Sequence, residues 1–319
     1  MAKSLESILV VAITSRALFD FEEENRIFDD GSGDHSEREQ RYMKLQQDRW
    51  EIPAEPSVGF QLCRKLLSMN GDGVKRTEVV VISRNDPISG ARVFRSAQHH
   101  NLDLTRGAFV RGDDPFLYLE PFRAKLFLSA NSDDVKKALN MSIPAATVFP
   151  RVIGNDLHPN ELRIAFDGDS VLFSDQAERV YKEQKLEAFK THEIENASVP
   201  LPAGPLQPFL SALHSLQNTL PAGSECRIKT ALITSRGAPA HERALRTLLH
   251  WGIQVDQALF LDGLEKRPFL DVFQPDFFFD DQLAHINPAM GTTPSGHVPY
   301  GIANETLGGE ATDRSQETS

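Results

Sequence analysis

The sequence contains two copies of one long unit, and this repeat limits the possible folds more than any other feature does. The copies align at a shift of 153 positions near their starts and 151 positions further on. The matching segments, in chain order, are Thr14–Leu18 with Asp167–Val171, Arg26–Phe28 with Arg179–Tyr181, Val81–Ser83 with Leu232–Thr234, Arg92 and Arg95 with Arg243 and Arg246, Phe109 with Phe260, and Leu126–Leu128 with Phe277–Phe279. Two long copies indicate a duplicated domain, because a solenoid needs three or more short repeats.

Each copy has the pattern of an α/β unit. Short apolar runs bounded by polar turns alternate with amphipathic stretches of helical length, which is typical of a parallel sheet. The expected strands are Ile8–Ile13, Val79–Ile82, Leu126–Leu128, Leu162–Phe166, Ala231–Ile233, Ala258–Leu261 and Phe277–Phe279. We therefore predict a Rossmann-like parallel α/β fold with halves at 1–150 and 151–303. Residues 304–319 have little apolar content and are expected to form a disordered tail.

Composition and charge exclude several classes of protein. With 40% hydrophobic residues, the 319-residue chain can bury a core. Its 45 acidic and 34 basic side chains give a net charge of −11, which repels duplex nucleic acid and anionic membranes. Two cysteines, Cys63 and Cys226, without metal-ligand spacing indicate a reduced, cytoplasmic protein. The first apolar run is too short to span a membrane and is read as a buried strand rather than a signal peptide.

The two copies differ in the residues that follow their strands. The second copy has Asp167, Asp169, Thr234, Lys266, Asp280 and Asp281, where the first has Thr14, Arg16, Ser83, Pro115, Ser129 and Ala130. Ligands of parallel α/β sheets bind at the carboxyl ends of the strands. The first half is therefore predicted to have kept its fold and lost catalysis, and the second half to carry the chemistry.

The strongest signal is a buried strand that runs directly into two carboxylates. The turn after this strand can place Asp167 as a nucleophile and magnesium ligand, and Asp169 as a general acid that later activates water. Gly168 allows the backbone to approach a phosphate closely. Alone, an Asp-x-Asp sequence is a weak signal, because most such pairs are solvated turn residues.

Three further elements strengthen this interpretation. Thr234 ends another strand with a hydroxyl that either donates to a phosphoryl oxygen or caps a helix. Asp280 and Asp281 follow an apolar strand, where adjacent like charges are costly unless a cation such as Mg²⁺ binds, although surface strand ends also carry such pairs without function. Lys266 either neutralises a transferring phosphoryl group or is a solvated surface lysine. Together the elements indicate phosphoryl transfer to an aspartate.

With these motifs the sequence resembles the haloacid dehalogenase superfamily, whose four motifs look like Phe166–Val171, Thr234, Lys266 and Asp280–Asp281. More closely it is similar to the cytosolic 5'-nucleotidase type I family. The segments that carry this similarity are Ser15–Phe19, Phe166–Glu178, Phe278–Gln282 and His297–Gly301. The resemblance implies Mg²⁺-dependent hydrolysis of nucleoside 5'-monophosphates, AMP prominent among them, and a small cap inserted at about 174–208 that covers the active site.

The resemblance also implies roles for individual residues. Asp167 becomes the phosphoaspartyl nucleophile, Asp169 the acid and base, and Thr234 and Lys266 the phosphate ligands. The predicted metal ligands are Asp167, Asp169, Asp280 and Asp281, with the direct contact of Asp280 or Asp281 left open. The chain departs from the family pattern in having Ser235 after the threonine and Arg267 after the lysine. Lys266 and Arg267 are therefore both candidates for the cation that meets the phosphate.

Substrate contacts are predicted in both halves. In the second half they are Gly168, Ser235 and Arg236, with His192, Glu195 and Asn196 of the cap either touching the substrate or simply solvated. In the first half, the polar strand-end residues either form a nucleoside pocket or cap the strands: Thr14, Ser15, Arg16, Ser83, Arg84 and Asn85. Arg16 stands where Asp169 stands in the other copy and suits an anion rather than a metal.

Two other functions remain open at this point. One is a phosphatase for sugar phosphates or other small esters, because the core chemistry does not depend on the leaving group. The other is a nucleotide-binding regulator without turnover, which the complete set of catalytic residues, Asp169 above all, argues against. The preferred base and sugar, activation by other nucleotides and the formation of a homo-oligomer also stay open.

Overall fold

The chain divides into two compact units. The computed structural model describes residues 8–29, 32–151, 156–221, 223–224 and 226–305. One unit consists of 1–162 with 215–228, and the other of 163–214 with 229–319. We call them the first and the second half. The division lies after Leu162 rather than after residue 150, and it gives 215–228 to the first half.

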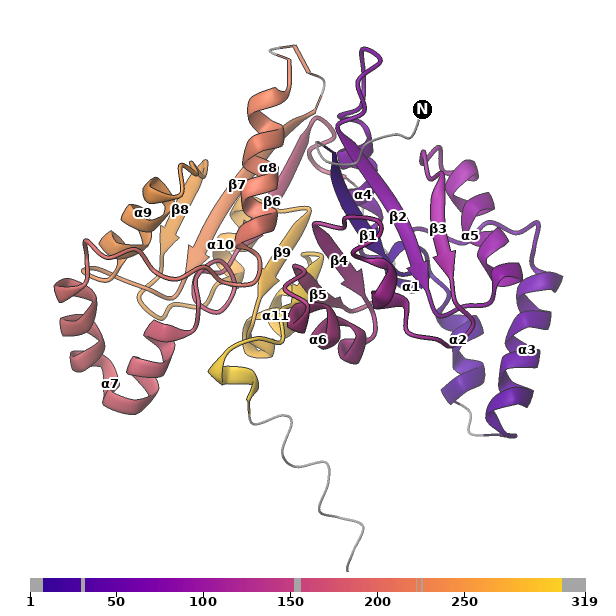
Figure 1. Ribbon diagram of the computed structural model, residues 1–319, viewed down its shortest axis with the longest axis horizontal. Helices are drawn as coiled ribbons and strands as arrows, with labels where there is room; N and C mark the ends of the chain where they lie inside the picture. The colour runs from indigo at the N-terminus through magenta and orange to yellow at the C-terminus, as the bar shows by residue number, and fades with distance from the viewer. Residues whose placement is uncertain (1–7, 30–31, 152–155, 222, 225, 306–319) are drawn as a thin grey trace, which may run out of the picture. The chain divides into compact units, whose positions relative to one another are not determined.

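The first half contains five parallel strands in the order β3-β2-β1-β4-β5. They are β1 (Leu9–Ile13), β2 (Thr77–Ser83), β3 (Arg106–Phe109), β4 (Leu126–Ser129) and β5 (Ala145–Val148). Every residue of β1, β2, β4 and β5 is buried, as expected for strands of a parallel sheet with both faces covered. Figure 1 shows these strands side by side with helices beside them.

The second half repeats this arrangement in the order β8-β7-β6-β9-β10. Its strands are β6 (Glu161–Phe166), β7 (Arg227–Thr234), β8 (Gln257–Phe260), β9 (Phe277–Asp280) and β10 (Ser295–His297), and the first two residues of β6 and of β7 fall on the other side of the division. The pairing registers also agree. Ile13 pairs with Leu128, and Phe166 pairs with Phe279 at the corresponding position. The same strand order and register confirm the duplication and the parallel α/β class that the sequence predicts.

The apolar runs predicted seven of the ten strands and missed β3, β5 and β10. β3 has the sequence Arg-Gly-Ala-Phe and is only half-buried, and β10 is the three-residue segment Ser-Gly-His. β5 is buried but is built from two alanines, a threonine and one valine. These strands are positioned by pairing with a neighbour rather than by a long apolar run of their own.

Helices connect the strands. They are α1 (Ser15–Leu18), α2 (Glu22–Asp29), α3 (His35–Asp48), α4 (Phe60–Leu67), α5 (Pro87–His99), the 3₁₀ turn η1 (Pro115–Tyr118), α6 (Ser132–Asn140), α7 (Gln176–Glu195), α8 (Gln207–Thr219), α9 (His241–His250), α10 (Arg267–Phe273), α11 (Leu283–Ala289) and the 3₁₀ turn η2 (Ile302–Asn304). Within the described residues, no helix is both long enough and apolar enough to cross a membrane.

The expected start of the tail at residue 304 is wrong. Asn304 lies in η2, and its side-chain amide donates to the backbone oxygens of Asp281 and Tyr300 at 3.0 and 2.9 Å. These bonds tie the segment to the end of β9 despite its low apolar content. The remainder of the expected tail, from residue 306 on, lies outside the described residues.

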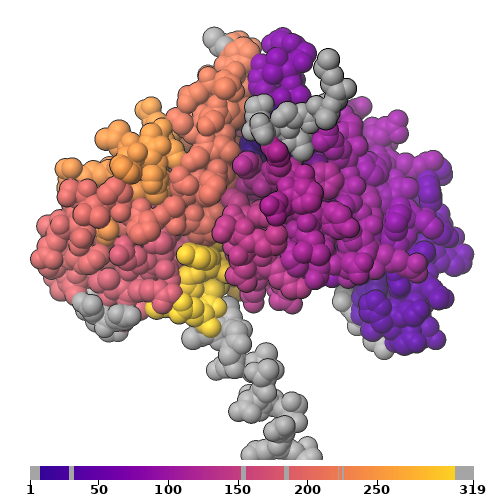
Figure 2. All heavy atoms as spheres, viewed as in Figure 1, coloured from indigo at the N-terminus to yellow at the C-terminus, as the bar shows by residue number. Residues whose placement is uncertain are grey.

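Each half carries an insertion that leaves and returns at a single antiparallel bridge. In the first half the bridge joins Phe19 and Pro56 and the insertion contains α2 and α3; in the second it joins Phe173 and Ala203 and the insertion contains α7. Figure 2 shows α2 and α3 in indigo and violet at the surface of their half. Only the second insertion was expected, at about 174–208. The first insertion contributes a buried side chain, Tyr42.

The first insertion is fastened to α5 by a set of contacts that we call the first clamp. Arg92 donates from Nε to the backbone oxygen of Ile52 at 2.8 Å and pairs through Nη1 with the buried carboxylate of Glu24. Ser96, one turn later, accepts the backbone N–H of Ala54 at 2.9 Å. Arg92 and Ser96 therefore lie on one face of α5. Together they bind α2 and the segment around Ile52 and Ala54, where the chain returns from the insertion.

The second insertion is fastened to α9 by matching contacts, the second clamp. Arg243, 151 positions after Arg92, donates from Nε to the backbone oxygen of Val199 at 2.9 Å and from Nη1 to Glu193 of α7 at 2.8 Å. Thr247 accepts the backbone N–H of Leu201 at 2.9 Å. The duplication therefore extends beyond the sheet to the way in which each insertion is held.

Candidate active site

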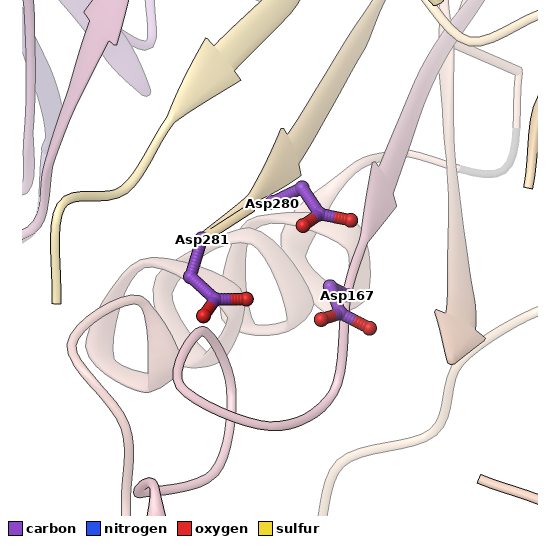
Figure 3. A group of neighbouring side chains, drawn as sticks. All are labelled: Asp167, Asp280 and Asp281. Atoms are coloured by element: carbon purple, nitrogen blue, oxygen red, sulfur yellow. The ribbon is translucent and has the colours of Figure 1, made fainter. Parts of the chain in front are cut away.

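Three buried carboxylates meet at the carboxyl ends of β6 and β9. Asp167 follows β6, Asp280 ends β9, and Asp281 is the next residue. Ligand oxygens of the three lie within 4.8 Å of one another, and Figure 3 shows the side chains turned toward one space. The backbone N–H of Asp167 donates to Phe279 at 2.8 Å, so sheet pairing continues up to the first carboxylate. Parallel neighbouring strands bring these residues together, as the sequence predicts.

Lys266 is the counter-ion of this cluster. Its Nζ lies 2.7 Å from Oδ1 of Asp167 and 2.6 Å from Oδ2 of Asp280, and its side chain is only 1% exposed. Burial disfavours the ammonium, but the two carboxylates outweigh burial and raise the pKa of Lys266 above its usual value. The alternative of a solvated surface lysine is therefore wrong. Arg267, the other candidate cation, is 47% exposed and faces Asp271 at 3.8 Å.

The three carboxyl groups differ in how the site changes their acidity. Burial raises the pKa of Asp167 to about 6 against the attraction of Lys266. Burial also opposes ionisation of Asp280, but Lys266 and His285, whose Nδ1 lies 3.1 Å from Oδ2, outweigh it and hold the pKa of Asp280 below its ordinary value. Burial and the neighbouring carboxylates raise the pKa of Asp281 to about 10.

Asp281 is the clearest sign of a cation site. Both its carboxylate oxygens are buried, and neither has a hydrogen-bond partner among the residues that the structure describes. A buried carboxylate without a partner is costly, and a hard divalent cation with oxygen ligands removes that cost. The three carboxylates thus fit Mg²⁺. Among the described residues, the acidic group that can share an ion contains these three, and Asp169 lies outside it.

Asp169 is held by Arg236. The guanidinium donates from Nε to Oδ2 at 2.8 Å and from Nη2 to Oδ1 at 2.7 Å, a bidentate arrangement that fixes the orientation of the carboxylate. Arg236 is buried and its Nη1 pairs with Glu193 of the second insertion. Its donors are therefore directed at protein carboxylates, although the sequence assigns it to substrate binding. Glu193 does not stand out in the sequence, because it is one of several acidic residues in the charged helix α7.

Thr234 and Gly168 lie against each other beside Asp167. A Cβ atom on Gly168 would stand 2.9 Å from Oγ1 of Thr234, so no side chain fits between the two strands there. Thr234 Oγ1 accepts the backbone N–H of Arg236 at 3.2 Å, which leaves the hydroxyl proton able to donate to a ligand. Helix α9 starts only after Ala240, so Thr234 does not cap it. Ser235, the next predicted contact, is exposed.

The predicted contacts from the cap mostly bind their own helix. His192 lies 3.1 Å from the carboxylate of Glu193, and Asn196 donates to the backbone oxygen of His192 at 2.8 Å. Glu195 is exposed. The buried member of this group is thus Glu193, which links α7 to Arg236 and through it to Asp169.

The predicted residues of the first half lie together in that half. Ser15 and Ser83 share a hydrogen bond at 3.0 Å, and Asn85 donates to Ser15 at 3.2 Å. Arg16 pairs with Glu22, and Arg84 with Asp134. The residues predicted from this half, Thr14, Ser15, Arg16, Ser83, Arg84 and Asn85, line one cavity of about 340 Å³.

Comparison with known proteins places these observations in a family context. The sequence model of a family described as 5'-nucleotidase matches residues 1–305. The human protein cytosolic 5'-nucleotidase 1B is 33% identical over 296 residues, which cover 89% of this chain and 48% of the human protein. The chain thus spans about half the length of this curated relative. No solved structure was found to match the chain.

Proposed function

The chain belongs to the 5'-nucleotidase family, and we propose that it hydrolyses nucleoside 5'-monophosphates such as AMP to a nucleoside and inorganic phosphate. The observation that carries this proposal is the buried group of Asp167, Asp281 and Lys266 at the strand ends. In this group Asp167 is the nucleophile, the carboxylate of Asp281 is a cation ligand, and Lys266 provides an ammonium group in a fixed position. Phosphoryl transfer needs these three elements in one place.

Asp167 is the proposed nucleophile. Lys266 binds its Oδ1, which leaves Oδ2 to attack phosphorus. Its pKa of about 6 leaves it ionised at neutral pH while making it a stronger base than an ordinary carboxylate. A bond forms between Oδ2 and phosphorus as the bond from phosphorus to the 5'-oxygen breaks, so that the phosphoryl group is held as an aspartyl phosphate and the nucleoside is released.

Asp169 is the proposed acid and base. In its protonated form it gives a proton to the 5'-oxygen as the nucleoside leaves, and the resulting carboxylate then takes a proton from the water that attacks the aspartyl phosphate. This second step returns Asp167 as a free carboxylate and releases phosphate. The two hydrogen bonds from Arg236 aim the carboxylate of Asp169, and Glu193 holds Arg236 in turn. Glu193 is therefore a positioning residue.

Thr234, Lys266 and Gly168 are the proposed phosphate contacts. The hydroxyl of Thr234 has a proton to donate, and the ammonium of Lys266 offsets the negative charge that gathers on the phosphoryl oxygens. The absence of a side chain at Gly168 keeps the space beside the hydroxyl open to an oxygen atom.

Asp167, Asp280 and Asp281 are the residues that would hold Mg²⁺. When bound, the ion would offset the charge of the carboxylates and polarise a phosphoryl oxygen. Asp169 is not one of these proposed metal ligands, because its carboxylate pairs with Arg236. Its proposed role is proton transfer.

The proposal is tested by phosphate release from a panel of nucleoside monophosphates and sugar phosphates, with Mg²⁺ and with a chelator. We expect Mg²⁺-dependent release from nucleoside monophosphates by the natural chain, no release by Asp167→Asn, and normal release by Asp133→Asn, the same change at an exposed aspartate of the first half. Release from sugar phosphates alone would keep the chemistry and contradict the substrate. No release from any ester would favour a nucleotide-binding regulator.

A further inference from the structure

The first half has a cavity of its own at the carboxyl ends of its strands. Its volume is about 340 Å³, which lies within the usual range of small-molecule sites. Hydroxyl groups of the strand ends line one part, and rings from the first insertion line another. The main contributors are Thr14, Ser15, Ser83, Ser129, Phe28 and Tyr42.

We propose that this cavity binds an uncharged nucleoside and catalyses nothing. The inference rests on the proposed function, because it takes the ligand class from the substrate of the second half. The ligand would be the nucleoside part of that substrate without its phosphate.

The position of the cavity supports this assignment. By the register that relates the halves, Thr14 corresponds to Asp167, Ser129 to Asp280, and Ala130 to Asp281. All three first-half residues line the cavity. The cavity thus lies in the first half at the position that corresponds to the candidate active site of the second half. The three carboxylates that would hold a cation are replaced there by two hydroxyl groups and a methyl group.

The charges around the cavity argue against a phosphate. Arg16 donates to both carboxylate oxygens of Glu22 at 2.9 Å, and Arg84 donates from Nε to Asp134 at 3.1 Å. Both arginines that line the described cavity are therefore neutralised by a carboxylate. The counterpart of Lys266 is Pro115, which provides no charge. An anionic ligand would have to displace these ion pairs, whereas an uncharged ligand would not.

The polar groups of the lining suit a sugar with hydroxyl groups. Oγ1 of Thr14 is buried without a hydrogen-bond partner in the described part of the chain, so a ligand hydroxyl can satisfy it. Ser15 and Ser83 share one hydrogen bond and each accepts another from Asn85, so each hydroxyl can take part in a third. Asn85 donates from Nδ2 to Ser15 and to Tyr42 at 3.2 and 3.0 Å, which leaves its amide oxygen as an acceptor.

The rings of the first insertion suit a flat base. Phe28 of α2 and Tyr42 of α3 have ring centroids 5.4 Å apart, and His35 lies 6.3 Å from Phe28. The first clamp holds α2 to α5, so that these rings stay over the strand ends. An aromatic group beside polar strand ends matches a molecule with a base at one end and a ribose at the other.

The proposal is tested by measuring adenosine binding to the 319-residue chain by calorimetry, with a chelator present to weaken phosphate binding at the carboxylates. Ala130→Phe places a ring in the cavity and should weaken adenosine binding about tenfold or more. Met141→Phe, an exposed change in the same half, should leave it unchanged. Thr14→Val keeps the shape and removes the hydroxyl, so it should weaken binding about threefold to tenfold even if the larger substitution perturbs folding.

Inorganic phosphate serves as the second probe. Phosphate binding that Ala130→Phe removes would overturn the assignment of an uncharged ligand. Equal adenosine affinity in the natural chain, Ala130→Phe and Thr14→Val would overturn the site itself. Phosphate release from nucleoside monophosphates is measured on the same samples. Its absence would contradict the proposed function, while adenosine binding that depends on Ala130 and Thr14 would still stand.

Discussion

The two halves hold their insertions in the same way and differ in what lies at the ends of their strands. Arg92 with Glu24 in the first half and Arg243 with Glu193 in the second join corresponding helices to corresponding insertions. The strand ends, by contrast, carry hydroxyls in one half and buried carboxylates in the other. The first half thus keeps the clamp and its insertion although it lacks the proposed catalytic residues. The clamp is thus shared by the two halves, whereas the carboxylates to which we assign catalysis occur at the strand ends of the second half.

Substitution of the residue that follows the first strand of each half by its counterpart in the other half should have the largest effect on phosphate release. Asp167→Thr removes the proposed nucleophile, and loss of a nucleophile lowers turnover by about 10⁴-fold or more. Thr14→Asp should create no activity, because the first half has Pro115 and Ala130 in place of the lysine and the last carboxylate. Phosphate release by single and double variants measures both effects. Activity in the double variant would show that the halves are catalytically interchangeable.

Removal of the buried glutamate from each clamp should have the next largest effect. Glu24 contacts Arg92 and Arg49, and Glu193 contacts Arg243 and Arg236, so each Glu→Ala change leaves two arginines without that partner. Breaking a buried ion pair from one side costs about 3–5 kcal/mol of unfolding free energy. Urea unfolding should show this cost in the half that carries the change.

The two tryptophans allow each half to be followed separately. Trp50 lies in the first half and Trp251 in the second, and single Trp→Phe backgrounds isolate each signal. Glu193→Ala should also slow phosphate release through Arg236, whereas Glu24→Ala should not. Glu242→Ala, which breaks an exposed pair, is the matched control and should change stability by less than about 1 kcal/mol. Equal loss of activity in both clamp variants would contradict the separation of roles.

Removal of the hydroxyl group from each clamp should lower the free energy of unfolding by a smaller amount, and by a similar amount in the two halves. Ser96→Ala and Thr247→Val each leave a backbone N–H without its acceptor, which costs about 1–3 kcal/mol. Unfolding in the two tryptophan backgrounds measures the cost in each half. Similar losses of unfolding free energy would show that the two clamps contribute equally to stability. A negligible loss in one half would show that other contacts hold its insertion.

Much of this arrangement follows from local sequence, and the rest depends on how the insertions fold back. The sequence predicts that three side chains meet, those of Asp167, Lys266 and Asp280. Asp167 follows an apolar strand, Asp280 ends one, and Lys266 lies shortly after one. Parallel strands end at the same edge of a sheet, which brings the three together. Pairing of Asp169 with Arg236 could not be predicted, since it depends on the position of the side chain rather than on the strand. Glu193 and Tyr42 were missed because charged helices bury single residues only where the chain packs them.

The smallest expected effect is a pH dependence confined to the second half. Asp281 has its pKa raised to about 10, so in chelator it keeps its proton when folded and loses it when unfolded at neutral pH. Stability should then be greatest near and below the ordinary pKa of about 4, and should fall as pH rises toward about 10.

Between pH 7 and 8.5 the loss should be at most about 1.4 kcal/mol per pH unit in the Trp251 signal. Tyr42 and Cys63 of the first half have their pKa raised by burial to about 12, and their ordinary values lie above this interval, so the Trp50 signal should stay nearly flat. Asp281→Asn should remove the slope, and saturating Mg²⁺ should reduce it, because an ion at the three carboxylates favours their ionised forms. A slope that persists in Asp281→Asn would mean that another group is responsible, and the contrast between a carboxylate cluster and a hydroxyl-lined cavity would no longer explain how the halves differ in their response to pH.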